Sequence, residues 1–339
     1  MENKIIHDIA KRIMKRGKGI LAADESNNTA GKRLESVGAQ NSEEMRRQYR
    51  DLFLSTENIE HYISGVILFD ETLRQKTNSG KLFGTHLDDL GILPGIKVDG
   101  GAKDNPDFPG EKITEGLSTL GDNLDEYYEI GARFTKWRAV IQIDESNDLP
   151  SKGAILENAI RLAKYAKKVQ TSGMVPIIEP EVILNGPHSI EKAEEVTEKT
   201  LKIVFEQILE ERVDLKGLIL KTSMVVPGSD SGEEMVPSEV AQRTVRVLQK
   251  TAPKDLAGIV FLSGGQTPEQ ARDNLNAIAR LEPLPWEIAF SYARAIQGPA
   301  LKIWKGKKEN VEKAREEFLK WLIFDVQADR GELDEDLEY

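Results

Sequence analysis

Short apolar runs alternate along this chain with longer stretches whose apolar residues recur at helical spacing. Most of the runs begin at a glycine, and this pattern is typical of strands buried on both faces of a parallel sheet. They occupy residues 19–23, 65–69, 95–98, 133–140, 175–178, 217–220, 258–262 and 287–290. Eight strand–helix units in 339 residues predict a closed (β/α)8 barrel, the TIM-barrel form of the α/β class, as a single domain over residues 1–339.

An open, doubly wound sheet is the competing α/β architecture. Dinucleotide-binding sheets of that kind carry a G-x-G-x-x-G turn after the first strand, and no such turn follows residues 19–23. The closed barrel is therefore favoured.

Helices are predicted where apolar residues recur every three or four positions. Ser189 stands at the start of one such stretch, and Thr267-Pro268-Glu269-Gln270 has the pattern of a capping box with proline at the first helical position. The predicted helices cover residues 1–16, 155–169, a long stretch from 189, a stretch from 267, and 311–321. Residues 72–93 and 100–123 fit the alternation poorly and are interpreted as surface excursions, and 324–339 as an acidic C-terminal tail.

The amino-acid composition limits the cellular locations, cofactors and binding partners that are expected for the protein. The chain has no stretch of eighteen apolar residues and no apolar region behind its N-terminus, so no membrane span and no signal peptide are expected. It has no cysteine, and its four histidines are scattered, so we expect neither a disulfide nor a metal site, and no cofactor. A cytoplasmic location is the default expectation. The net charge of −11 argues against nucleic-acid or anionic-membrane partners.

Polar side chains stand at the end of nearly every predicted strand. In a barrel these carboxyl ends converge at one mouth, where function gathers. They are Asp24, Glu71, Lys97, Asp99, Lys136, Arg138, Glu179, Glu181, Lys221, the run Ser263-Gly264-Gly265, Ser291 and Arg294. Any one of them alone is more often part of a structural ion pair. Together they favour a pocket for a doubly anionic substrate.

Lys221 directly follows the buried run at 217–220 and has two interpretations. It is either a lysine that extends to the surface from a strand end, or an uncharged amine that attacks a carbonyl carbon to form a Schiff base. Nearby cations, of which Lys136 is the best placed, would disfavour its ammonium form. Glu179 is a candidate proton carrier. Backbone N–H groups of Ser-Gly-Gly and the fork of Arg294 suit phosphate.

Several motifs resemble those of class I fructose-1,6-bisphosphate aldolases. The likeness is collinear from about Lys4 to Trp321. It rests on GKGILAADES (17–26), GIKVD (95–99), RFTKWRAV (133–140), PIIEPE (176–181), LILK (218–221), MVVPG (224–228), FLSGGQT (261–267) and FSYARAIQGPAL (290–301). The resemblance implies reversible, metal-independent cleavage of fructose 1,6-bisphosphate to dihydroxyacetone phosphate and glyceraldehyde 3-phosphate, in glycolysis and gluconeogenesis.

The resemblance also implies residue roles. Lys221 is expected to be the Schiff-base nucleophile and Glu179 the proton-transfer residue, with Glu181 beside it. Asp24 and Lys136 are expected to assist carbinolamine formation and carbon–carbon cleavage. One phosphate is expected at Ser263, Gly264, Gly265, Ser291 and Arg294, and the other phosphate and the sugar hydroxyls at Ser26, Arg33, Lys97 and Arg138. A homotetramer is implied as well.

Other functions stay open at this point. A metal-dependent barrel enzyme would also gather carboxylates at one mouth. Another Schiff-base barrel enzyme, such as a transaldolase, would keep the lysine but lack the flanking motifs. A catalytically silent sugar-phosphate binder would not need a nucleophile. The final residue, Tyr339, is either a proton shuttle that folds over the pocket or part of a solvated tail.

Overall fold

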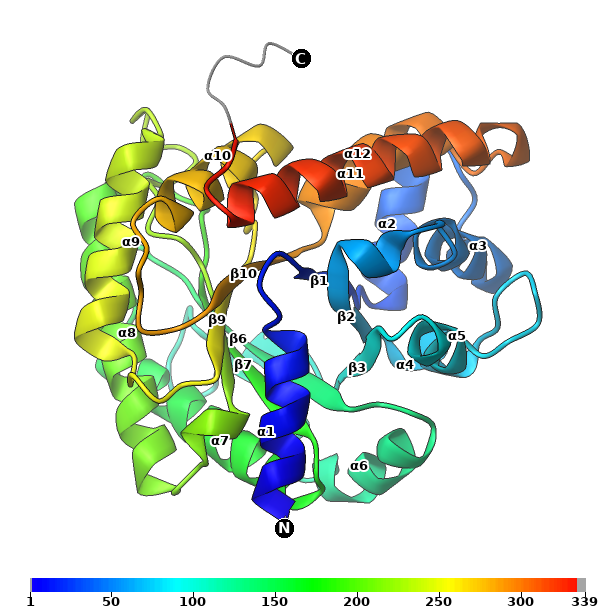
Figure 1. Cartoon of the computed structure of the whole chain (residues 1–339). Coiled ribbons are helices and arrows are strands. Elements are labelled where there is room, and N and C mark those ends of the chain that lie inside the picture. Colours follow the sequence, from blue (N-terminus) through cyan, green and yellow to red (C-terminus); the bar gives the residue numbers. More distant parts are fainter. Residues whose placement is uncertain (1, 334–339) are drawn as a thin grey trace.

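The computed structural model describes residues 2–333 and contains a closed barrel of eight parallel strands (Figure 1). Around the barrel the strands are ordered β1-β10-β9-β8-β7-β6-β3-β2. They are β1 (Gly19–Ala23), β2 (Ile63–Leu68), β3 (Leu93–Lys97), β6 (Phe134–Ile141), β7 (Val175–Val182), β8 (Ile219–Thr222), β9 (Gly258–Phe261) and β10 (Ile288–Tyr292). Each coincides with one of the eight predicted runs to within a few residues, so the (β/α)8 prediction is confirmed.

Helices cover the outside of the barrel. They are α1 (Glu2–Ile13), α2 (Asn27–Ser36), α3 (Glu43–Leu54), α4 (Asp70–Arg74), α5 (Phe83–Asp89), α6 (Leu120–Glu129), α7 (Lys152–Thr171), α8 (Ile190–Glu210), α9 (Pro237–Thr251), α10 (Pro268–Ala279), α11 (Arg294–Trp304) and α12 (Val311–Asp329). Ser189 caps α8 by accepting a hydrogen bond from the backbone N–H of Lys192, and Thr267 and Gln270 form the predicted capping box of α10. No helix within residues 2–333 combines the length and apolarity needed to cross a bilayer.

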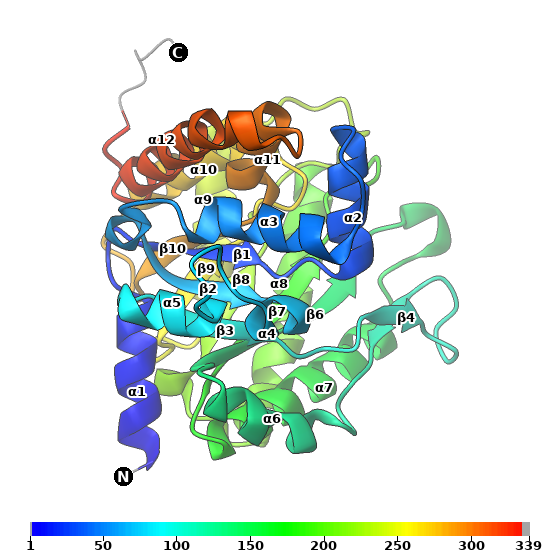
Figure 2. The same ribbon diagram turned by 90° about the vertical axis from the view of Figure 1, so that its right-hand side faces the viewer.

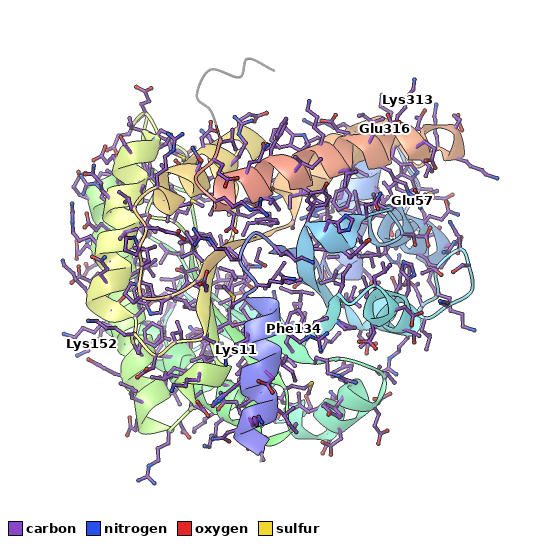
Figure 3. All side chains as sticks on the ribbon, viewed as in Figure 1. Lys11, Glu57, Phe134, Lys152, Lys313 and Glu316 are labelled. Atoms are coloured by element: carbon purple, nitrogen blue, oxygen red, sulfur yellow. The ribbon has the colours of Figure 1, made fainter. Side chains whose placement is uncertain are left out.

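The inside of the barrel is a separate hydrophobic cluster that α1 closes at the amino ends of the strands. Ile6, Ile9 and Ile13 of α1 are buried in this cluster together with Phe134 from β6. Figure 3 shows Phe134 near the middle of the barrel beside α1, whereas Lys152 and Lys313 lie at the periphery. Because α1 blocks this end, access to the barrel interior is left to the carboxyl ends of the strands.

A short antiparallel hairpin, β4 (Ala102–Asp104) with β5 (Lys112–Thr114), lies at the opposite side of the barrel from α1 (Figure 2). It belongs to the predicted excursion 100–123, and the residues of β4 are exposed. The carboxyl-end mouth is therefore bordered by an added loop structure.

Two predictions about peripheral segments need correction. Residues 72–93 are not a plain excursion, because they contain α5, whose Phe83 and Leu87 are fully buried against the barrel. The acidic tail does not begin at residue 324, because α12 continues to Asp329 and buries both Asp325 and Asp329. The prediction failed there because carboxylate side chains were assumed to be solvated. Tyr339 lies outside the described residues.

Candidate active site

A cavity of about 730 Å³ opens at the carboxyl ends of the barrel strands. The side chains at these strand ends converge on it, as the barrel fold requires. Every residue to which the sequence analysis gave a catalytic or substrate-binding role lines this cavity except Gly265: Asp24, Ser26, Arg33, Lys97, Lys136, Arg138, Glu179, Glu181, Lys221, Ser263, Gly264, Ser291 and Arg294. The strand-end pattern in the sequence thus located the cavity.

A chain of buried charges crosses the floor of the cavity. Lys221 Nζ lies 3.2 Å from Oε1 of Glu179, and the other oxygen of that carboxylate lies 3.0 Å from Lys136 Nζ. Lys136 Nζ in turn lies 2.7 Å from Oδ2 of Asp24. Lys221, Glu179 and Lys136 are each at most 4% exposed. One carboxylate therefore lies between two amines, with one of its oxygens facing each.

The protonation states along this chain follow from burial opposed by neighbouring charge. Burial alone would lower the pKa of Lys136, but the carboxylates of Asp24 and Glu179 raise it above the usual lysine range. Burial raises the pKa of Asp24, yet Lys136 and Lys221 outweigh that effect and bring it to about 2. The same two lysines overcome burial to lower the pKa of Glu179. At neutral pH, Lys136 is therefore charged and both carboxylates are ionised.

The register of the strands also places further charged side chains at the wall of the cavity. Arg138 lies two residues beyond Lys136 on β6, so both point into the cavity, as their alternation predicted. Arg138 Nε pairs with Glu181 of β7. Lys97, at the end of β3, lies 2.6 Å from Oδ1 of Asp99, whose other oxygen accepts a hydrogen bond from the backbone N–H of Arg138. These pairs hold cationic side chains at the cavity wall.

The loop after β1 positions two further predicted residues. Ser26 caps α2 and accepts a hydrogen bond from the backbone N–H of Thr29, so its side chain is held at the cavity edge. Arg33, near the end of α2, pairs with the buried Glu25. Arg50 of α3 pairs with the other oxygen of the same Glu25.

The loop after β9 and the start of α11 form the opposite wall. Gly264 and Gly265 adopt φ values of +53° and +102°, a conformation that favours glycine and turns the backbone tightly after Ser263. Gly265 lies just outside the cavity, although a Cβ added to it would approach Arg294 Nη2 to 3.8 Å. Ser291 Oγ is buried and has no hydrogen-bond partner among residues 2–333, and no ion pair of Arg294 is formed within that range. Both are available to an anion.

Sequence reasoning misplaced Glu71 and missed Glu25. Glu71 does not reach the cavity, because it lies in the first turn of α4, where it pairs with Arg46 and accepts a hydrogen bond from Asn27. Glu25 lines the cavity beside Asp24. The two acids are adjacent in one motif, and the sequence does not indicate which cationic side chain pairs with each of them. Lys103 of β4 also lines the cavity, and its position in a supposed excursion concealed it. No three His, Asp or Glu side chains within the described range converge as ligands for a metal ion.

The fold is a (β/α)8 barrel with a charged cavity and a buried lysine at the carboxyl ends of its strands, an arrangement typical of barrel enzymes. Comparison with known families gives its membership: the family model "Fructose-bisphosphate aldolase class-I" matches residues 5–338. The chain belongs to the class I fructose-bisphosphate aldolase family. It is accordingly a carbon–carbon lyase that cleaves fructose bisphosphate.

Individual relatives agree with this membership. The chain is 51% identical over 310 residues to the probable fructose-bisphosphate aldolase class 1 of Xylella fastidiosa strain 9a5c, a match that covers 91% of this chain and 92% of the relative. It is 51% identical over 304 residues to the cytosolic fructose-bisphosphate aldolase 4 of Arabidopsis thaliana, covering 89% and 77% of the two chains. The solved fructose-bisphosphate aldolase of Plasmodium falciparum, in complex with TRAP and an inhibitor, superposes with a TM-score of 0.96 at 44% identity, covering 98% and 96%.

Proposed function

We propose that cleavage proceeds through a Schiff base on Lys221, with Glu179 as the proton carrier. The observation that carries this proposal is the contact between Lys221 Nζ and a Glu179 carboxylate that also contacts charged Lys136. Glu179 is ionised and adjacent, so it accepts the proton that the Lys221 nitrogen loses when it attacks a carbonyl carbon. Lys136 and Asp24 complete a path along which protons move without solvent.

The steps follow from this arrangement. The Lys221 nitrogen attacks the ketone carbon of the open-chain sugar and loses a proton to Glu179, while the carbonyl oxygen takes a proton from Lys136 to give a carbinolamine. A second proton from the Glu179–Lys136 path releases that oxygen as water and leaves a protonated imine. The hydroxyl on the fourth carbon then loses its proton to the Glu179 carboxylate, and the bond between the third and fourth carbons breaks. Its electron pair enters the imine to form an enamine, and the aldehyde product departs. Reprotonation of the third carbon and hydrolysis of the imine release the second product and regenerate Lys221.

The two phosphates bind at opposite walls of the cavity. Ser263, Gly264, Gly265, Ser291 and Arg294 bind one of them, with support from the unpartnered Ser291 hydroxyl and from an Arg294 that pairs with no carboxylate in residues 2–333. Ser26, Arg33, Lys97 and Arg138 bind the other phosphate and the sugar hydroxyls. Glu181 holds Arg138 in place. Charge-assisted hydrogen bonds of this kind suit a bisphosphate.

Borohydride trapping tests the proposal. The protein is incubated with dihydroxyacetone phosphate, reduced, digested and analysed by mass spectrometry, with Lys221→Met as the matched control. An adduct on the peptide that contains Lys221, absent from the variant, supports the Schiff base. No adduct, together with loss of activity in a chelator, would favour a metal-dependent mechanism instead.

We extend the proposal to the cellular location of the enzyme and to its oligomeric state. The enzyme acts in the cytoplasm, in glycolysis and gluconeogenesis, in keeping with the cytosolic relative from Arabidopsis thaliana and the cytoplasmic isozyme of Spinacia oleracea, which is 48% identical. It assembles as a homotetramer, which the family resemblance supports. Light scattering coupled to gel filtration checks the assembly, and a monomeric mass at micromolar concentration would contradict it.

A further inference from the structure

A buried hydrogen-bond network joins the two walls of the active-site cavity. Tyr49 Oη donates to Oε1 of Gln297 at 2.7 Å, and Arg33 Nη1 donates to both of these oxygens at 3.3 Å. Gln297 Nε2 donates to the backbone carbonyl of Ala22, at 2.8 Å. Both polar atoms of the Gln297 amide are thus hydrogen-bonded, the oxygen accepting from two donors and the nitrogen donating to one acceptor. The network links β1, α2, α3 and α11.

Gln297 connects this network to Arg294. The two residues lie three positions apart on α11 and therefore project from neighbouring points of one helix face. Gln297 is 1% exposed and Tyr49 is fully buried. The Tyr49 ring also packs against Trp304 at the other end of α11, with ring centroids 6.3 Å apart. The start of α11 is therefore tied to the same side chains that hold Arg33.

The guanidinium of Arg33 is anchored at one nitrogen only. Its contacts with Glu25, Tyr49 and Gln297 all use Nη1, and among residues 2–333 its Nε and Nη2 atoms donate to no protein atom. Arg33 also lines the cavity. A planar fork that is fixed at one corner keeps its remaining donors in a defined direction.

Arg33 and Arg294 also affect one another electrostatically. Burial lowers the pKa of Arg33, and the positive charges of Arg50 and Arg294 lower it further although Tyr49 opposes them. The like charges of Arg33 and Arg294 disfavour one another, whereas Asp24 and the ion pair with Glu25 offset the charge of Arg33. The network therefore holds Arg33 close enough to Arg294 for their charges to interact.

We propose that Tyr49 and Gln297 are positioning residues that set the separation between Arg33 and Arg294, and thereby the preference for a sugar with two phosphates over one with a single phosphate. This inference rests on the proposed function, in which the two arginines bind different phosphates. A second phosphate adds affinity only where its binding group stands at the right distance, because a misplaced group must be reordered at a cost in free energy. Neither Tyr49 nor Gln297 lines the cavity, so they act through the arginines.

Tyr49→Phe tests the inference, because it keeps the buried ring and removes only the hydroxyl. The readout is the ratio of kcat/KM for fructose 1,6-bisphosphate to kcat/KM for fructose 1-phosphate. We expect this ratio to fall about threefold to tenfold, the range for one lost hydrogen bond. The change should appear in the KM for the bisphosphate, with kcat nearly unchanged. Gln297→Met should have the same direction of effect.

Tyr127→Phe is the matched control, since Tyr127 Oη makes a hydrogen bond of 3.1 Å to Asp70 away from the cavity. The ratio of kcat/KM for the bisphosphate to kcat/KM for the monophosphate should be the same in Tyr127→Phe as in the wild type. If Arg33→Ala lowers the ratio and Tyr49→Phe leaves it unchanged, the positioning role is overturned while the proposed function stands. If Arg33→Ala itself leaves the ratio unchanged, the phosphate role of Arg33 fails, and the inference fails with it. A lower melting temperature of Tyr49→Phe with an unchanged ratio would likewise assign Tyr49 a purely structural role.

Discussion

Lys136 and Glu179 form a buried ion pair, with 3.0 Å between Nζ and Oε2, and this pair fixes a positive charge near Lys221, the proposed nucleophile. Burying two charges costs free energy that their attraction only partly returns, so the pair is weak evidence for stability. Its position next to Lys221 explains it better. In the proposed mechanism, Glu179 accepts and returns protons beside Lys221, and the charged Lys136 lies at the other oxygen of that carboxylate.

Lys221→Met is the direct test of the nucleophile. The substitution keeps an unbranched side chain in a buried position and removes the amine, so we expect a folded protein that has lost at least about 10³-fold in kcat, as expected for a group that reacts covalently. Circular dichroism checks the fold and a coupled assay checks turnover. Residual turnover within tenfold of the wild type would contradict the role of Lys221.

Arg294→Ala should weaken substrate binding far more than it weakens folding. Removing a charge-assisted hydrogen bond to phosphate costs about 1.5–3 kcal/mol, which corresponds to a rise in KM of roughly tenfold to a hundredfold. Arg246→Ala is the control, because Arg246 pairs with Glu194 on the outer surface, with its side chain 50% exposed. An Arg294→Ala protein that aggregates or melts early would instead make Arg294 a structural residue.

The sequence predicted the barrel because buried parallel strands leave an unambiguous signal. Each strand is a short apolar run, and the polar residue that ends it faces the mouth by geometry alone. What each polar residue contacts was not predictable. Glu71 and Glu25 both follow strands, yet one pairs with Arg46 outside the cavity and the other with two arginines at its edge. The ion-pair partner of each glutamate depends on the positions of α2 and α3, and the pattern of apolar runs does not predict those positions.

Gly95→Ala should destabilise the barrel interior. A Cβ at Gly95 would lie 2.3 Å from the ring of Phe134, which is itself fully buried and has no room to move. Overpacking of this kind costs typically 1–3 kcal/mol. Urea denaturation should show a lower midpoint. Gly298→Ala is the matched control, because a Cβ there meets nothing within 4 Å and α11 gains a better helix former. Its midpoint should stay the same or rise, and equal midpoints for both variants would contradict the steric explanation.

Asp329 shows why the end of α12 was misjudged from sequence. A carboxylate near the chain terminus was taken as solvated, but Asp329 is 2% exposed. Burial raises its pKa to about 8, more than the backbone N–H of Gly17 lowers it, and Glu282 raises it further. A carboxyl group in such a place is neutral at pH 7, and a neutral acid is compatible with the buried face of a helix.

This shift predicts a stability that declines as pH rises. The pKa of Asp329 in the folded protein, about 8, lies above the ordinary aspartate value of 3.8, so folding takes up a proton between these values. The contribution of protonated Asp329 to the free energy of unfolding is complete below pH 3.8. It falls by about 1.4 kcal/mol for each pH unit as the pH rises toward 8. Asp329→Asn keeps the shape and removes the titration. The variant should therefore gain stability relative to the wild type progressively from pH 5 to pH 8.

Urea midpoints measured at several pH values between 5 and 9 check this prediction. Asp122→Asn, on the exposed side of α6, is the control and should follow the wild-type pH dependence. The difference between Asp329→Asn and wild type should be smallest at pH 5, grow toward pH 8 and then level off, because above the folded pKa both states of the wild type are ionised. A difference that is the same at pH 5 and pH 9 would assign the effect to packing of the amide rather than to a proton taken up on folding.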